Sequence, residues 1–397
     1  MDKSVSTNKM LRTEVEVRDR INDLPDSLLL HILSFLPAKE AVGTCLLSKR
    51  WRPLWPSLPT LDLKRKDFQR LKFFHQFVDK MLKFVDLKSV KKCVLWLSYY
   101  ETHEYFRPQK ISRWINAMMN TQVEHLELHL MPRKGDYELP SSVFTANNIK
   151  VLKLSGATGA IMWSSISNVT VGTLSHVNLP SLEVLHLKDV KFTNVRSLEM
   201  LLAACALLKH LVLTDLYGEF NFPPDSRGLN HLVTADVPQF LLPLKVFSNA
   251  TFLRFHLRCR LSPMKVTPDI PIFYNLTHLE FAYYSYDWNT TMKYLQSCPK
   301  LEILVIGQFV CNEMLESTII DVPHCVSSSL KEFHLDGYRG KNGDFDLARF
   351  IMKNATVLRI ISITKDSYSR ATWKNRNLKR ISTCPISSTN CKLLLLG

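Results

Sequence analysis

The chain has 397 residues, of which 46% are hydrophobic, and a formal net charge of +15 at pH 7. This length suits two or three domains or one elongated array, and the hydrophobic content excludes a chain that is disordered overall. The basic residues are dispersed along the sequence, so we interpret the charge as a solvated basic surface, with an acidic partner as the alternative.

Two classes of protein are excluded by pattern. No apolar run approaches the roughly 18 residues of a membrane span. Nine cysteines are scattered without a CxxC pair, which predicts reduced thiols rather than disulfides or a structural zinc site. Residues 1–18 are polar and charged, which predicts a disordered tail without a secretory signal. We therefore expect the nucleus, the cytoplasm or both as the location.

The first apolar segment, residues 20–55, reads RINDLPDSLLLHILSFLPAKEAVGTCLLSKRWRPLW. Pro25 suits the first turn of a helix, and Pro37 ends that helix. Leu28, Ile32 and Leu36 lie at i, i+4 and i+8, and further leucines fill an adjoining stripe. The helix is therefore expected to be apolar around most of its circumference.

Two more helices are predicted after this one. One covers residues 39–47, and Ser48 is placed to cap another that carries Trp51, Leu54 and Trp55. A module of this size cannot enclose so much apolar surface by itself. The excess predicts either a protein-docking face or a cap that seals a following repeat array, and the pattern alone favours neither.

A repeat follows, with the form apolar-x-x-apolar-x-apolar. Leu126, Leu152, Leu185 and Leu211 occupy equivalent positions, separated by 26, 33 and 26 residues. Ten copies are identified, at residues 94–97, 123–128, 149–154, 182–187, 208–213, 229–232, 252–255, 276–281, 301–306 and 330–335. Such a period with an LxxLxL pattern is the leucine-rich-repeat signature, in which stacked short strands bury a continuous core. The alternative is a set of unrelated αβ units.

The expected fold class is α/β. Residues 90–320 are predicted to form an irregular solenoid, with a parallel sheet on the concave face and helices and loops, such as a helix over 195–205, on the convex face. The strand residues between the core leucines are expected to face the concave side. A basic stripe on that side is the predicted substrate surface and would favour an acidic ligand; it comprises Lys153, His186, Lys188, Arg254 and His256. The alternative is a solvated face.

Two segments resemble known domains. Residues 19–63 closely resemble the F-box motif of plant F-box proteins, in the LP pair, HILSFLP, LLSKRWRPLW and the trailing LDL. Residues 322–363, VPHCVSSSLKEFHLDGYRGKNGDFDLARFIMKNATVLRIISI, resemble the FBD domain that closes many plant F-box/leucine-rich-repeat proteins, and the tail to residue 397 is similar to the end of that domain. After GYRG the acidity is weaker than is usual for the family. The resemblance implies an F-box, a repeat array and a C-terminal FBD cap at 322–397.

This resemblance implies a substrate-recognition subunit of an SCF-type ubiquitin ligase. The F-box would dock on a Skp-family adaptor, and through it on cullin and RING subunits, while the repeats hold an unidentified protein substrate. The residues that match the adaptor-binding positions of the family are Leu24, Pro25, Leu28, Ile32, Leu36, Leu46, Leu47, Ser48, Trp51 and Trp55. Trp51 is expected to be the main anchor, since tryptophans dominate such interfaces. The alternative is a leucine-rich-repeat scaffold or binding protein that acts outside a ligase.

No catalytic residue, cofactor or metal is expected. His125 and His129 lie four residues apart on an expected strand without an obvious third ligand, and no GxSxG motif occurs. Nucleic-acid binding is not expected either, because no known module and no cluster of arginines with interleaved aromatic residues is present.

Overall fold

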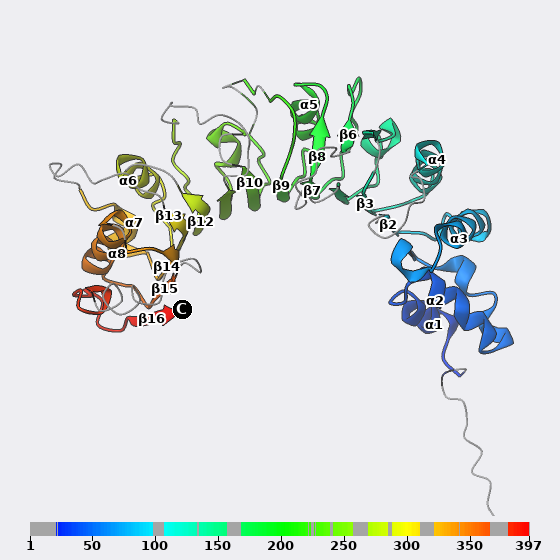
Figure 1. The fold of residues 1–397 in the computed structure, drawn as a ribbon, viewed down its shortest axis with the longest axis horizontal. Helices are drawn as coiled ribbons and strands as arrows, with labels where there is room; N and C mark the ends of the chain where they lie inside the picture. The colour runs from blue at the N-terminus through cyan, green and yellow to red at the C-terminus, as the bar shows by residue number, and fades with distance from the viewer. Residues whose placement is uncertain are drawn as a thin grey trace, which may run out of the picture.

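The computed structural model describes residues 21–396 except residues 22, 98–106, 133–134, 157–167, 221, 224–225, 227, 239–240, 257–268, 285–287, 310–320, 341 and 366–379. The predicted disordered tail, residues 1–18, lies outside the described residues. The described chain forms an arc, with the N-terminal helices at one end and the last strand at the other (Figure 1).

A parallel sheet of thirteen strands runs along the arc in the described part of the chain and lines its inner side (Figure 1). In spatial order the strands are β1 (Thr60–Lys64), β2 (Lys92–Leu97), β3 (His125–Leu130), β5 (Val151–Ser155), β7 (Val184–Lys188), β9 (His210–Thr214), β10 (Thr234–Pro238), β11 (Phe252–His256), β12 (His278–Tyr284), β13 (Ile303–Phe309), β14 (Glu332–Tyr338), β15 (Ile360–Lys365) and β16 (Lys392–Leu396). Strands that follow one another along the chain are spatial neighbours in this sheet, as expected when each repeat contacts only the next.

Helices cover the outer side of the arc (Figure 1). They are α3 (Leu71–Phe84), α4 (Pro108–Met119), η5 (Ser141–Phe144), α5 (Ser197–Ala203), η6 (Leu244–Phe247), α6 (Trp288–Gln296), α7 (His324–Ser328) and α8 (Asn342–Asn354). A second parallel sheet of β4 (Tyr137–Glu138), β6 (Val169–Val171) and β8 (Val190–Phe192) lies on the same outer side. The fold is therefore the predicted α/β solenoid, and α5 falls within the predicted helix at 195–205.

The repeat leucines form two continuous rows in the core. Leu126, Leu152, Leu185 and Leu211 stand opposite one another on β3, β5, β7 and β9, and each is 0% exposed. Complete burial of one leucine side chain is worth about 1.5–3 kcal/mol, so a ladder of such residues is the main stabilising term of the array. This confirms the interpretation of LxxLxL as a strand with two inward side chains.

The predicted alignment of one repeat copy, at residues 229–232, was wrong. The pattern at 229–232 lies before β10, in which Ala235 and Val237 occupy the two core rows opposite Leu253 and Phe255. Leu232, rather than Leu229, corresponds to the first apolar position of the other copies. Ala235 stands where the other copies have a leucine, so the LxxLxL pattern is not recognisable in this copy. Its small side chain still belongs to the core, where it is 0% exposed.

Both ends of the sheet extend beyond the predicted repeats. Leu61 and Leu63 on β1 pair with Cys93 and Leu95 on β2, so the LDL that closes the F-box pattern is also the first repeat strand. At the other end, β14, β15 and β16 continue the same parallel sheet through the FBD-like region. That region therefore caps the solenoid by adding strands to it.

Candidate functional site

The first helix, α1 (Asp26–Leu33), carries apolar residues on two faces. Leu29 and Leu33 point inward and are 0% exposed, whereas Leu28 and Ile32 are 48% and 42% exposed. Pro25 occupies the N-cap position of the helix, as the sequence predicted for the helix start. The exposed leucine and isoleucine lie one turn apart, so they form a stripe on the solvent side.

The inner face of α1 closes a small core that is separate from the repeat core. Trp51, Leu54 and Leu58 pack there with Leu29 and Leu33. Trp51 is only 6% exposed, so the structure contradicts its predicted role as the main surface anchor. Its indole fills the centre of the module, which accounts for a large aromatic residue at this position.

The remaining helices are shorter than predicted. The segment expected at 39–47 consists of α2 (Ala38–Gly43) and the 3₁₀ turn η1 (Thr44–Leu46). The expected third helix is two 3₁₀ turns, η2 (Lys49–Trp51) and η3 (Trp55–Ser57). Pro53 and Pro56 account for this, because each removes a backbone donor that a continuing helix would use.

Ser48 and Arg50 hold these turns in place. The Ser48 hydroxyl accepts a hydrogen bond from the Arg50 backbone N–H at 3.2 Å, which is the predicted cap. The Arg50 guanidinium donates to the Leu24 carbonyl and to Asp26 Oδ1, the latter at 2.9 Å. Arg50 thus ties the LP turn to the third segment, a role that sequence reasoning missed.

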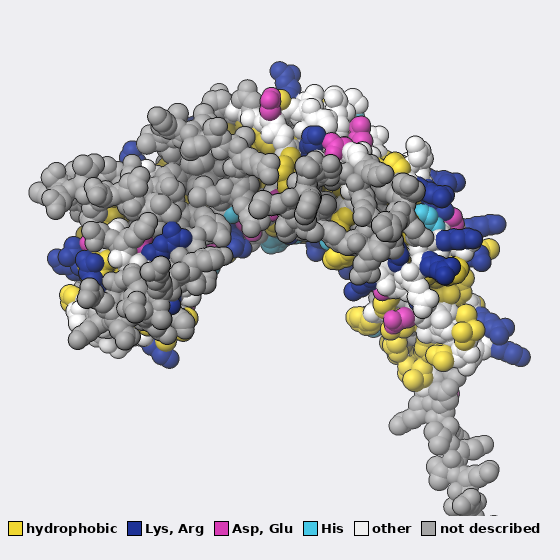
Figure 2. All heavy atoms as spheres, in the orientation of Figure 1, with side chains coloured by type: hydrophobic (Ala, Val, Ile, Leu, Met, Phe, Trp, Pro, Cys, Tyr) yellow, Lys and Arg dark blue, Asp and Glu magenta, His cyan; other side chains and the backbone are white. Residues whose placement is uncertain are grey.

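Exposed apolar side chains gather at this end of the molecule (Figure 2). Leu46 and Leu47 are 86% and 74% exposed, and Phe35 and Ile21 are 74% and 54% exposed. We refer to the exposed set Ile21, Leu28, Ile32, Phe35, Leu46 and Leu47 as the N-terminal apolar face. A soluble domain rarely leaves this many large apolar side chains uncovered within one small module, so the face has the character of a docking surface.

The ten predicted adaptor-binding residues divide by exposure. Five are exposed (Pro25, Leu28, Ile32, Leu46, Leu47), four are half-buried (Leu24, Leu36, Ser48, Trp55) and one is buried (Trp51). Trp55 packs against both the small core and the repeat core, so it joins the two. Phe35 and Ile21 were not among the predicted site residues. Phe35 could have been found, because it lies seven residues after Leu28 and so on the same face of the predicted helix.

The five predicted substrate residues lie on strands of the main sheet, but they do not make a continuous basic stripe. Arg254 stands between two carboxylates, with its Nε 3.0 Å from Glu280 Oε1 and its Nη1 3.7 Å from Asp236 Oδ2. The Lys153 ammonium lies 3.9 Å from Glu127 Oε2. Two of the expected cations are therefore partly neutralised by acidic residues on neighbouring strands.

The two histidines of the predicted basic stripe are partly or fully buried, whereas a charged surface stripe needs exposed side chains. His256 is 9% exposed, and its Nε2 lies 2.9 Å from the Leu213 carbonyl oxygen. Burial lowers the pKa of His186, and the neighbouring ammonium groups of Lys153 and Lys188 lower it further. Both effects favour neutral imidazoles, so the histidines add little positive charge to this surface.

A polar and aromatic cluster occupies β2 and β3. The Glu127 carboxylate contacts His125 Nε2 at 3.4 Å and His129 Nε2 at 2.6 Å, and these hydrogen bonds hold its pKa well below the usual range. The His129 ring stacks on Trp96, with ring centroids 4.0 Å apart. Trp96 is 36% exposed and offers a planar contact surface that sequence reasoning did not single out.

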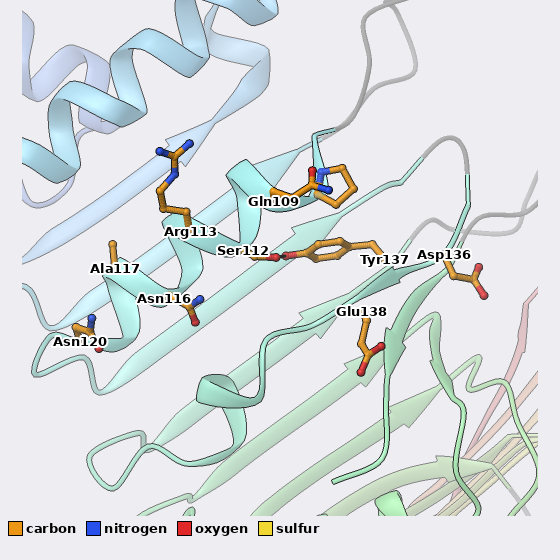
Figure 3. Close-up of a pocket in the computed structure, with 10 residues that line it drawn as sticks. Gln109, Ser112, Arg113, Asn116, Ala117, Asn120, Asp136, Tyr137 and Glu138 are labelled. Carbon is orange, nitrogen blue, oxygen red and sulfur yellow. Dashed lines mark hydrogen bonds between the residues drawn. The ribbon is translucent and has the colours of Figure 1, made fainter.

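A groove of about 750 Å³ lies on the outer side, between α4 and β4. Figure 3 shows Tyr137 of β4 pointing toward Ser112 of α4, and their hydroxyls are 2.9 Å apart. Asp136 forms an ion pair with Lys191 at 2.8 Å. The groove is lined by Pro108, Gln109, Ser112, Arg113, Asn116, Ala117, Asn120, Asp136, Tyr137 and Glu138. These side chains include no histidine or cysteine that would suggest a nucleophile–base pair.

The described part of the chain has no evident metal site, disulfide or membrane-spanning helix. No group of three or more His, Cys, Asp or Glu side chains there is arranged to hold a metal ion. The seven cysteines in that part are free thiols. No described helix is both long enough and apolar enough to cross a membrane.

The fold and its N-terminal module define the class: a small helical module with an exposed apolar face, joined to a leucine-rich-repeat solenoid. Family models match in the same order. The F-box domain model matches residues 21–62, the model "FBD-associated F-box protein At5g56370, LRR repeats" matches residues 111–232, and the FBD model matches residues 320–363.

Curated relatives from Arabidopsis thaliana match over nearly the whole chain. F-box/LRR-repeat protein 13 is 28% identical over 95% of this chain and 96% of its own length. FBD-associated F-box protein At1g66310 is 26% identical with the same coverage, and F-box/FBD/LRR-repeat protein At4g26340 is 29% identical over 95% of this chain and 99% of its own length. The chain thus carries an F-box domain, leucine-rich repeats and an FBD region, and over nearly its whole length it is similar to F-box/FBD/leucine-rich-repeat proteins of Arabidopsis thaliana.

Proposed function

We propose that this chain is a substrate-recognition subunit of an SCF-type ubiquitin ligase, which acts in the nucleus or the cytoplasm. The N-terminal apolar face would dock on a Skp-family adaptor, and cullin and RING subunits would join through that adaptor. The concave face of the solenoid would hold the protein to be ubiquitinated. The chain itself would contribute proximity, because it raises the effective concentration of substrate lysines near the ubiquitin thioester.

The N-terminal apolar face carries this proposal. Leu46, Leu47 and Phe35 are each more than 70% exposed, although the module has a complete core of its own around Trp51. The exposed residues are therefore not needed to close the fold. Their role as a cap for the first repeat is also disfavoured, because a cap residue would be buried against the solenoid.

The proposed substrate surface is the inner side of the arc. Trp96 supplies an exposed aromatic side chain on β2. Hydrogen-bonding groups are supplied by paired charges on strands that follow β2 in the sheet, namely Glu127, Lys153, Asp236, Arg254 and Glu280. Because acidic and basic side chains alternate across these strands, we expect selection by matched polar contacts rather than by attraction to a uniformly acidic substrate.

The test is complex formation with a Skp-family adaptor. The full chain and a plant adaptor are co-expressed, and the complex is measured by size exclusion and by calorimetry. The Ile32→Ala/Phe35→Ala variant removes an isoleucine and an aromatic ring from the N-terminal apolar face. Ile272→Ala/Tyr274→Ala is the matched control, since these side chains are 49% and 63% exposed on another part of the chain.

We expect a stable complex with the parent chain, a much weaker complex with the first variant and an unchanged complex with the control. A well-folded parent that binds none of several adaptors would refute the proposal. A parent that binds an adaptor but recruits no cullin and supports no ubiquitin transfer would instead favour the alternative, a leucine-rich-repeat scaffold that acts outside a ligase.

A further inference from the structure

Basic residues occur along the whole chain, but acidic residues offset them unevenly, so most of the net positive charge arises in a short part of it. Residues 64–92 contain ten basic and three acidic residues, and residues 107–120 contain three basic and no acidic residues. Together these two segments carry a net charge of +10, out of +15 for the whole chain. They include α3 and α4, which pack against each other on the outer side of the arc, where Lys and Arg side chains gather (Figures 1 and 2).

The outer face of α3 combines this charge with exposed aromatic rings. Phe73 and Phe84 are 50% and 56% exposed, although the inner face of the helix already buries Phe74, Val78 and Met81. Phe73, Lys80 and Phe84 lie at i, i+7 and i+11, so they follow one line along the helix. The two rings are about 16 Å apart along the helix axis, which is three helical turns.

The lysines beside these rings have no acidic partners within the described residues. Lys72, Lys80 and Lys83 are exposed, and the Lys83 ammonium lies 5.5 Å from the centroid of the Phe84 ring. The acidic residue of the same helix, Asp79, is already engaged by Lys110 at 2.7 Å. The charge of this face is therefore available to an external partner.

We propose that the outer face of α3 is a second protein-docking surface, which binds an acidic amphipathic helix of a partner. The regular spacing of the two rings suits a helix laid alongside α3, whose own apolar residues recur after the same three turns. The surrounding ammonium groups select Glu and Asp on the flanks of that helix. Because this face lies on the outer side of the arc, a partner could occupy it while the concave face holds another protein.

The chemistry of the face favours a protein over other anionic partners. The exposed cations on α3 are lysines, which act as point charges, whereas phosphate recognition favours the planar fork of arginine. The two rings stand apart on a convex helix rather than in a groove that could track a nucleic-acid strand. A membrane-binding helix would present a continuous apolar side to the bilayer, whereas here Lys80 lies between the two rings.

The probe is a fluorescein-labelled synthetic peptide of about 20 residues, in which leucines form one helical stripe and glutamates flank it. Binding to the full chain is measured by fluorescence anisotropy. We expect Lys80→Glu/Lys83→Glu and Phe73→Ala/Phe84→Ala each to weaken binding about tenfold or more. Binding of the parent chain should also weaken as salt is raised, because the attraction is partly electrostatic.

Two matched variants show whether the effect is local. Lys245→Glu/Lys353→Glu makes the same change in charge at exposed lysines elsewhere, and Leu46→Ala/Leu47→Ala removes leucines from the N-terminal apolar face. Both should bind the peptide like the parent, so the result does not depend on whether an adaptor binds. Circular dichroism confirms that each variant is folded.

Three outcomes overturn the proposal. The first is that the parent chain, at a concentration of about 100 µM, does not bind the peptide, because a weaker Kd would not support a specific helix interface. Another is equal binding by the α3 variants and the parent. The third is that an oligo-dT strand or phosphatidylserine vesicles bind in a way that depends on Lys80 and Phe73 while the peptide does not, which would assign the face to nucleic acid or to lipid.

Discussion

Removing Leu46 and Leu47 together should abolish most adaptor binding without affecting the fold. The two side chains are 86% and 74% exposed in the free chain. Leu→Ala removes three carbons, worth about 2.4 kcal/mol if fully desolvated by a partner at about 0.8 kcal/mol per carbon. Scaled by the exposed fractions, the pair accounts for about 4 kcal/mol at most, a loss of several hundred-fold in affinity at about 1.4 kcal/mol per tenfold change.

The assay is isothermal titration of the purified adaptor into the parent chain, the Leu46→Ala/Leu47→Ala variant and a Leu207→Ala control. Leu207 is 45% exposed but lies far along the chain, so its truncation should leave affinity unchanged. The free energy of unfolding of the double variant should change by less than about 0.5 kcal/mol, because exposed side chains contribute little to it. An affinity within threefold of the parent, with the fold intact, would refute the assignment of this face to the adaptor.

Three further predictions concern interior groups. Trp51→Ala should lower the free energy of unfolding by about 3–5 kcal/mol, because it opens a cavity in the small core. Trp51→Phe fills most of that space and should keep adaptor binding. Loss of binding by a fully folded Trp51→Phe variant would show that this residue belongs to the interface. Glu127 has a lowered pKa in the folded chain, so its stabilising contribution is complete above its unfolded pKa of about 4.5 and is lost as pH falls below it. Urea unfolding should therefore show Glu127→Gln less stable than the parent by about 1–2 kcal/mol at pH 7 and by a clearly smaller margin at pH 2. An unchanged difference at both pH values would contradict this. Burial raises the pKa of the Cys93 thiol to about 12, so a thiol reagent at pH 8 should modify it far more slowly than the half-buried Cys45; equal rates measured by mass spectrometry would show that the first repeat opens readily.

The sheet could be predicted from sequence because its signal is local and repeated. A strand with inward residues at every second position can be recognised from the motif LxL alone. Leu126 and Leu128 form this motif on β3. The same rule failed at Ala235, where a smaller side chain occupies the row. The rule could not show that β1 and β16 extend the sheet, because pairing between strands depends on where distant segments meet in space.

The candidate site was predicted less completely than the sheet, for a physical reason. Helix α1 is apolar on two faces, and hydrophobic spacing cannot tell which of them meets the core. Leu29 and Leu33 are inside and Leu28 and Ile32 outside, although all four are large aliphatic residues. The choice is made by the chain that follows, because Trp51 is brought back against the inner face.

The position of Trp51 also separates the residues that hold the module together from those on its surface. A tryptophan in the core supplies a large buried area with one residue, so the module can be stable without burying Phe35, Leu46 or Leu47. The outer residues are then not needed for the fold, so under the proposed function their replacement should change affinity and leave the fold intact. On the concave face, the same side chains serve both the structure and the proposed contact. Arg254 is held between Asp236 and Glu280. A substitution of Arg254 would therefore alter the local electrostatic balance as well as any substrate contact. Adaptor binding and substrate selection would therefore respond differently to mutation, the first by loss of apolar contact area and the second by uncompensated charge.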